Sequence, residues 1–121
     1  MPRGSVLFID DRPTLLALRK ENLETRGYSV QTAASVPSGM KVLEEAVVDA
    51  VLLEYKQESL ETENVAFNIK RRFPRLPIVL LSACVEMPER LLWLVDEYAH
   101  KSAQPEELIH TIERALLRQA S

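Results

Sequence analysis

Carboxylates, a hydroxyl and an amine follow short apolar stretches at four places in this chain. Asp10 and Asp11 come after the first stretch, Glu54 after the second, Ser82 after the third and Lys101 shortly after the last. Neighbouring carboxylates repel one another unless a cation neutralises them, and oxygen ligands favour a hard ion such as Mg²⁺. A lysine and a hydroxyl opposite them would suit a phosphoryl group. These residue types predict a site for a metal ion and a phosphoryl group.

Unbroken apolar runs must position these side chains. The runs cover residues 6–9, 50–53 and 77–81, and they are rich in branched residues, which is typical of strands covered on both faces. Residues 28–33 alternate in the manner of another strand, and Tyr98 lies in a brief last strand. We therefore expect five strands.

Helical spacing of apolar residues fills the segments between the strands. The expected helices run from Pro13 to Gly27, from Ser35 or Ser38 through Leu43, around residues 65–73, around residues 91–95, and from Pro105 onward. Five strand–helix repeats require a parallel sheet with right-handed crossovers and helices on both faces. Ligands bind at the carboxyl ends of the strands in such sheets, so the polar residues should meet at one edge.

Length and composition limit the kind of protein. With 121 residues, the chain is expected to be a single domain over residues 1–121, with no second domain. A net charge of −3 argues against a nucleic-acid surface, and no apolar run is long enough to cross a membrane. The single cysteine, Cys84, cannot close an internal disulfide, so a cytoplasmic location is expected.

Taken together, the motifs resemble the receiver domains of bacterial response regulators from two-component systems. The resemblance covers nearly the whole chain and is carried by residues 8–11, 50–54, 78–83 and 98–101. It implies a flavodoxin-like α/β fold, a three-layer sandwich with a five-stranded parallel sheet in the order 2-1-3-4-5 and five helices. It also implies a phosphorelay signalling module and not an enzyme.

The resemblance assigns a role to each polar residue. In the family, a histidine kinase gives a phosphoryl group to an aspartate at the end of the third strand, and Glu54 holds that position here. The implied Mg²⁺ ligands are Asp10, Asp11, Glu54 and the backbone carbonyl of Lys56. The implied phosphoryl-binding and switch residues are Ser82, Tyr98 and Lys101.

Glu54 departs from the family pattern, which has an aspartate as the phosphoryl acceptor. Glutamate moves the attacking oxygen outward by roughly 1.5 Å, one carbon–carbon bond. A misplacement of about 1 Å can cost on the order of a hundredfold in rate. We therefore expect Glu54 to be a poor acceptor, and its charge to imitate in part the phosphorylated state.

Three further departures concern the loops. Residues 57–63 are strongly acidic, and the loop expected after Glu54 lacks the usual proline and glycine. Ser102 follows Lys101 where the family has a cis-bonded proline, so a trans bond is expected. The segment from Ser82 to Tyr98 is about one helical turn shorter than usual, so the fourth helix should be short or displaced. Pairing of two copies through the fourth and fifth helices is a further expectation from the family.

Several alternatives stay open at this level. Asp10 and Asp11 could merely cap a helix, and Glu54 could form a salt bridge to Lys101 without a metal. We expect Tyr98 and Trp93 to be packed; an exposed Trp93 would favour a partner surface. The leading hypothesis is a divergent receiver that works mainly or wholly without phosphorylation. The alternatives are a conventional receiver and, more remotely, a small Mg²⁺-dependent phosphatase or nucleotide-binding enzyme, although no glycine-rich phosphate loop is present.

Overall fold

Strands and helices alternate along the whole of the described chain. The computed structural model describes residues 3–55, 60–83, 87–102 and 104–120. The strands are β1 (Ser5–Ile9), β2 (Ser29–Ala33), β3 (Ala50–Glu54), β4 (Ile78–Ser82) and β5 (Glu97–His100). The helices are α1 (Pro13–Glu24), α2 (Val36–Glu45), α3 (Glu61–Arg72), α4 (Glu89–Leu94) and α5 (Pro105–Ala120).

The strands form one parallel sheet in the order β2-β1-β3-β4-β5, which confirms the predicted topology. The register pairs Ile9 with Leu53, Leu53 with Leu80, and Ser82 with His100. Because all strands are parallel, their carboxyl ends lie at one edge of the sheet. The residues that follow the strands are thereby brought to that edge.

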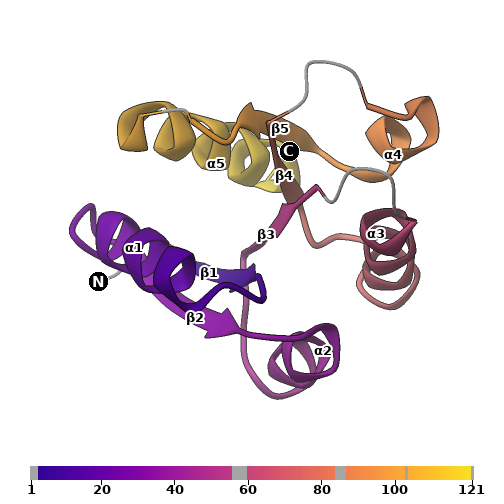
Figure 1. The fold of residues 1–121 in the computed structure, drawn as a ribbon, viewed down its shortest axis with the longest axis horizontal. Helices are drawn as coiled ribbons and strands as arrows, with labels where there is room; N and C mark the ends of the chain where they lie inside the picture. The colour runs from indigo at the N-terminus through magenta and orange to yellow at the C-terminus, as the bar shows by residue number, and fades with distance from the viewer. Residues whose placement is uncertain (1–2, 56–59, 84–86, 103, 121) are drawn as a thin grey trace.

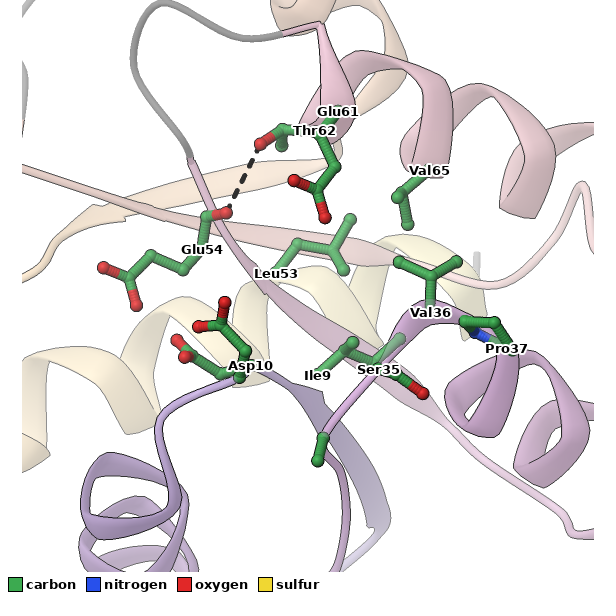
Figure 2. A pocket seen from close by; sticks show the side chains of 12 residues that line it. Ile9, Asp10, Ser35, Val36, Pro37, Leu53, Glu54, Glu61, Thr62 and Val65 are labelled. Carbon is green, nitrogen blue, oxygen red and sulfur yellow. Dashed lines mark hydrogen bonds between the residues drawn. The ribbon is translucent and has the colours of Figure 1, made fainter.

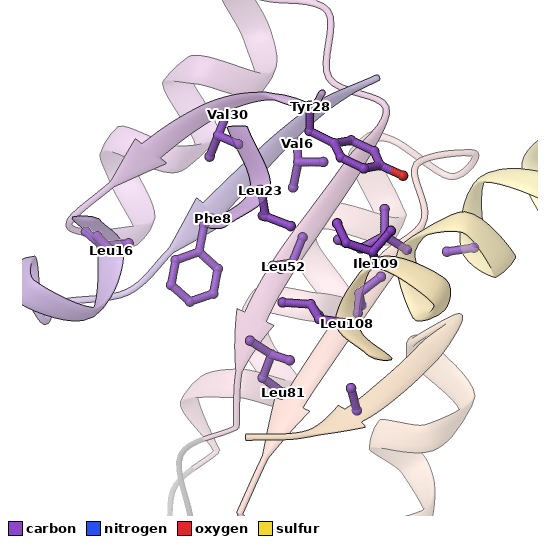
Figure 3. Packing of buried hydrophobic residues seen from close by; sticks show 14 residues of the cluster. Val6, Phe8, Leu16, Leu23, Tyr28, Val30, Leu52, Leu81, Leu108 and Ile109 are labelled. Atoms are coloured by element: carbon purple, nitrogen blue, oxygen red, sulfur yellow. The ribbon is translucent and has the colours of Figure 1, made fainter. Parts of the chain in front are cut away.

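Helices cover both faces of the sheet, as predicted (Figure 1). α1 and α5 lie on one face, and α2, α3 and α4 lie on the other. Alternate residues of each central strand point to opposite faces, so Phe8 and Leu52 pack toward α1 and α5, while Leu7 and Val51 pack toward the other helices. Figure 3 shows the first of these two cores, with Leu108 of α5 lying over the central strands.

Local signals in the sequence set several helix ends. Pro13 occupies the first turn of α1, and Gly27 follows the helix with a positive φ of 94° that suits glycine. Ser35 caps α2, where its hydroxyl and that of Ser38 form a reciprocal capping box. α4 has only six residues, in agreement with the expected short fourth helix.

The expected packing of Trp93 and Tyr98 is wrong. Trp93 is 81% exposed and Tyr98 is 59% exposed. α4 is so short that Leu91 is its one fully buried described residue, and Trp93 projects from the helix into solvent. Tyr98 lies on the edge strand β5, where Ala99 takes the buried position and its two neighbours face outward.

The described backbone has ordinary peptide bonds and no membrane-spanning helix. Across the part of the chain that it describes, every peptide bond is trans, including the bond between Lys101 and Ser102. Within the same residues, no helix has both the length and the apolar character needed to span a membrane.

Candidate functional site

The carboxyl edge of the sheet brings together most of the residues predicted for the site. Asp10 directly follows β1, Glu54 is the last residue of β3, and Ser82 is the last residue of β4. Lys101 follows β5, and its backbone N–H donates to the carbonyl of Ser82 at 2.8 Å. Lys56 lies outside the described residues.

Glu54 and Lys101 form a direct ion pair. Lys101 Nζ lies 2.8 Å from Glu54 Oε1, and the two side chains are 35% and 12% exposed respectively. The salt bridge weighed as an alternative is therefore present. Thr62 at the start of α3 adds a long hydrogen bond of 3.4 Å to the backbone carbonyl of Glu54, drawn as a dashed line in Figure 2.

Arg12 is the most informative site residue that sequence reasoning missed. Its backbone N–H and its Nε both donate to Asp10 Oδ1, at 2.9 and 3.1 Å, and its Nη2 donates to Asp10 Oδ2 at 2.9 Å. The same Nη2 forms an ion pair with Glu54 Oε2. One guanidinium thus links the carboxylate that follows β1 to the carboxylate that ends β3, the adjacent strand.

Arg19 of α1 is a second arginine that the sequence analysis missed. It is buried, and its Nη2 donates to the backbone carbonyl of Lys101 at 2.9 Å. Burial lowers the pKa of Arg19, the charge of Arg12 lowers it further, and the charge of Asp10 opposes both. Arg19 therefore ties α1 to the turn that presents Lys101 to Glu54.

Sequence signals for the two arginines were present but weak. Arg12 directly follows the two aspartates, so a cation beside the acidic pair could have been noted. Arg19 lies seven residues later, two helical turns along α1, and its buried side of the helix is apolar elsewhere at Leu16 and Leu23. A lone arginine in such a pattern is usually read as a solvated side chain, because arginine is rarely buried.

A cavity of about 330 Å³ opens beside the acidic residues. It lies between the first turns of α2 and α3, and Figure 2 shows the Asp10 and Glu54 side chains approaching one another at its border. Asp11 and Glu61 also line it, together with apolar side chains such as Leu53 and Val65. The predicted acidic pocket is therefore present, with apolar walls.

The acidic residues at this edge of the sheet are the candidate ligands for Mg²⁺. Carboxylate oxygens of this kind are suitable ligands by type. However, both oxygens of Asp10 accept hydrogen bonds from Arg12, and the two oxygens of Glu54 face Arg12 and Lys101. Among the residues that the structure describes, no three His, Cys, Asp or Glu side chains are arranged to hold a metal ion. The site as arranged does not fit Mg²⁺ unless Arg12 moves.

Comparison of the sequence with known proteins identifies the response regulator receiver family and transcriptional regulatory proteins. The model of the response regulator receiver domain matches residues 6–113. The transcriptional regulatory protein GlrR of Escherichia coli is 32% identical over 84 residues, which cover 69% of this chain and 19% of GlrR. The alkaline phosphatase synthesis transcriptional regulatory protein PhoP of Bacillus subtilis is 28% identical over 118 residues, 95% of this chain and 49% of PhoP. The chain thus spans about a fifth to a half of these relatives.

Solved structures agree over nearly the whole chain. The response regulator protein TrrA of Thermotoga maritima, in complex with Mg²⁺–BeF, matches with a TM-score of 0.81 and 29% identity, covering 93% of this chain and 99% of TrrA. A response regulator receiver domain protein of Clostridium thermocellum matches with a TM-score of 0.85 and 26% identity over 97% of both chains.

Proposed function

Because the chain belongs to the response regulator receiver domain family of two-component systems, we propose that it is an atypical receiver that signals mainly or wholly without phosphorylation. The family is a signalling module and not a known enzyme class. In this proposal the domain recognises a protein partner while Glu54 stays paired with Arg12 and Lys101.

The observation that carries this proposal is the pairing of both Glu54 oxygens with cations. Phosphorylation of a carboxylate requires one of its oxygens to attack phosphorus in line with the leaving group. In this chain Lys101 holds one Glu54 oxygen and Arg12 holds the other. An attacking oxygen would first have to leave a cation, in addition to being misplaced by the longer side chain.

The Glu54–Lys101 pair also supports a permanently signalling-competent state. A phosphoryl group brings nearly two negative charges, whereas Glu54 brings one, at a position where it pairs with Lys101 at 2.8 Å. The pair is therefore a partial and constant imitation of the phosphorylated arrangement. The Glu54–Lys101 pair forms without the action of a kinase.

The proposal is tested by offering the protein a phosphoryl donor. The whole chain is incubated with acetyl phosphate and Mg²⁺, or with beryllofluoride and Mg²⁺, and adducts are followed by intact mass and by backbone NMR shifts. We expect no stoichiometric adduct on the wild type and a measurable gain for Glu54→Asp. Glu44→Asp, a matched change at a half-exposed glutamate that pairs with Arg72, should gain nothing. A stoichiometric adduct on the wild type, or a shift across the whole fold, would overturn the proposal.

A conventional phosphorylatable receiver is the second candidate. It is favoured by the retained positions of Asp10, Asp11, Ser82 and Lys101 at the carboxyl edge of the sheet. A histidine kinase would then be the phosphoryl donor. The same incubation decides between the two, because proteolysis of a modified protein identifies whether Glu54 or another residue carries the group.

The exposed apolar residues of α4 and α5 support a protein partner, which could be a second copy of the chain. Trp93 and Leu92 project from α4 and Leu117 projects from α5, with exposed fractions of 81%, 41% and 69%. Sedimentation over a range of concentrations, with Trp93→Ala as the variant, tests self-association. We further propose that residues 1–121 make up one receiver domain and that this domain works in the cytoplasm.

A further inference from the structure

Arg12 holds Asp10 with three hydrogen bonds. Its backbone N–H and its Nε donate to Oδ1, and its Nη2 donates to Oδ2. This forked arrangement matches the geometry of a carboxylate, and such charge-assisted pairs are stronger than neutral hydrogen bonds. The Asp10 side chain is only 2% exposed, so Arg12 and not water solvates it.

The same guanidinium reaches the second strand end. Its Nη2 pairs with Glu54, whose side chain is 12% exposed. Two carboxylates that are nearly excluded from water repel each other strongly unless a cation lies between them. Arg12 is that cation, because it contacts Asp10 and Glu54 at once.

The four charged groups in direct contact balance one another without any metal, while Asp11 and Glu61 line the adjoining cavity. Asp10 and Glu54 contribute two negative charges, and Arg12 and Lys101 contribute two positive charges through direct contacts. A divalent ion entering between the carboxylates would meet the guanidinium and would have to displace it. Arginine stays protonated throughout the physiological pH range, so this counter-charge is always present.

We infer that Arg12 is a built-in counter-cation that takes the place of a divalent metal between Asp10 and Glu54, and that it keeps this site in one charge state whatever the Mg²⁺ concentration. The inference replaces the expected Mg²⁺ site of Asp10, Asp11 and Glu54. It deepens the proposed function and rests on it only for the consequence in signalling, since a guanidinium between the carboxylates occupies the place of the Mg²⁺ that neutralises charge during phosphoryl transfer.

The experiment measures Mg²⁺ affinity directly, by calorimetric titration of the whole chain with MgCl₂ and no phosphoryl donor. We expect the wild type to bind Mg²⁺ only in the millimolar range or more weakly. Arg12→Ala should bind Mg²⁺ at least about tenfold more tightly, because the ion no longer has to displace a guanidinium. Arg12→Lys, which keeps the charge, should stay weak. Arg72→Ala, which releases Glu44 from a surface pair, is the matched control and should equal the wild type.

Each outcome decides the inference. Submillimolar Mg²⁺ binding by the wild type would overturn it, and this measurement needs no variant to fold. Equal gains in Arg12→Ala and Arg72→Ala would also overturn it, since any lost positive charge would then suffice. Circular dichroism verifies that Arg12→Ala is folded, and Arg12→Gln, which keeps the length of the side chain, replaces it if it is not.

Failure of this inference and failure of the proposed function are distinguishable. Tight Mg²⁺ binding without a phosphoryl or beryllofluoride adduct would remove the role of Arg12 and leave a phosphorylation-independent receiver. A phosphoryl adduct on Glu54 together with weak Mg²⁺ binding would remove the proposed function and leave Arg12 as the counter-cation.

Discussion

Lys101 Nζ lies 2.8 Å from Glu54 Oε1, so the amine that follows β5 is already engaged by the carboxylate that ends β3. The pair connects the ends of β3 and β5, which lie on either side of β4, at the carboxyl edge of the sheet. Arg12 meets the other oxygen of Glu54, and Arg19 holds the backbone of Lys101. The candidate site is therefore a network in which each charged group is positioned by another.

Replacing Glu54 by glutamine should destabilise the fold. The change removes a nearly buried negative charge and leaves Arg12 and Lys101 facing a neutral group. Removing one partner of such an arrangement costs about 1–3 kcal/mol, since the remaining charges lose their compensation. Urea denaturation measures the loss. Glu44→Gln breaks an exposed pair with Arg72 and should lose much less; equal losses would mean that burial of Glu54 contributes nothing.

Arg19 should respond differently to two substitutions. Its Nη2 donates to Lys101, but its buried Nε has no hydrogen-bond partner among the described residues. Arg19→Met keeps most of the packing volume and removes a poorly compensated charge, so stability should change by less than about 1 kcal/mol. Arg19→Ala should cost about 2–4 kcal/mol, because a cavity is left beneath α1.

The arginine's positioning role needs a readout other than stability. If Arg19 orders the turn after β5, Arg19→Met should change the NMR shifts of Lys101 and Ser102 although the fold is retained. Unchanged shifts in that variant would show that Arg19 only fills space. Equal stability losses in both variants would show instead that the lost hydrogen bond to Lys101, and not the lost volume, sets the cost.

Sequence patterns predicted the architecture because strand and helix periods depend on local chemistry. The apolar runs before Asp10, Glu54 and Ser82 became the three central strands, and parallel order brought their ends together. Trp93 was misjudged because its exposure depends on how a six-residue helix is rotated against the sheet. That rotation is set by tertiary packing of Leu91 and not by spacing along the chain.

The site was predicted in part for a similar reason. Glu54 and Lys101 could be paired from strand ends alone, because the topology fixes the backbone positions that carry them. The bridging role of Arg12 could not be predicted from the sequence, since it depends on the direction that its long side chain takes from the backbone. Arg19 was hidden for the same reason, since its guanidinium reaches from α1 to the Lys101 carbonyl beyond the end of β5.

Tyr28 should make stability depend on alkaline pH. Burial raises the pKa of Tyr28 above its ordinary value of 10.0; nearby Arg3 opposes the rise and Glu113 adds to it. The unfolded chain loses the phenolic proton near pH 10, whereas the folded chain keeps it to higher pH. The folded protein therefore binds more protons in this window, and stability falls as pH rises, by at most about 1.4 kcal/mol per pH unit.

The measurement compares urea unfolding of the wild type and Tyr28→Phe from pH 8 to pH 11. The free energy of unfolding of the wild type minus that of Tyr28→Phe should be constant below about pH 9. Above about pH 10 this difference should fall, because only the wild type loses stability through Tyr28. Tyr98→Phe is the control, because that ring is 59% exposed and keeps its contact with water on unfolding. A constant difference for Tyr28→Phe across the whole range contradicts the prediction.

Trp93 gives an optical test of the exposed α4 surface, because it is the single tryptophan of the chain. With 81% of its surface exposed, it should emit at the wavelength of a hydrated indole and be quenched by acrylamide almost as efficiently as a free indole. Unfolding should barely shift the spectrum, and Trp93→Ala should change stability by no more than about 0.5 kcal/mol. A blue shift that grows with protein concentration and disappears on dilution would identify Trp93 as part of a contact between copies. A blue-shifted, poorly quenched spectrum at every concentration would contradict the exposed position of Trp93.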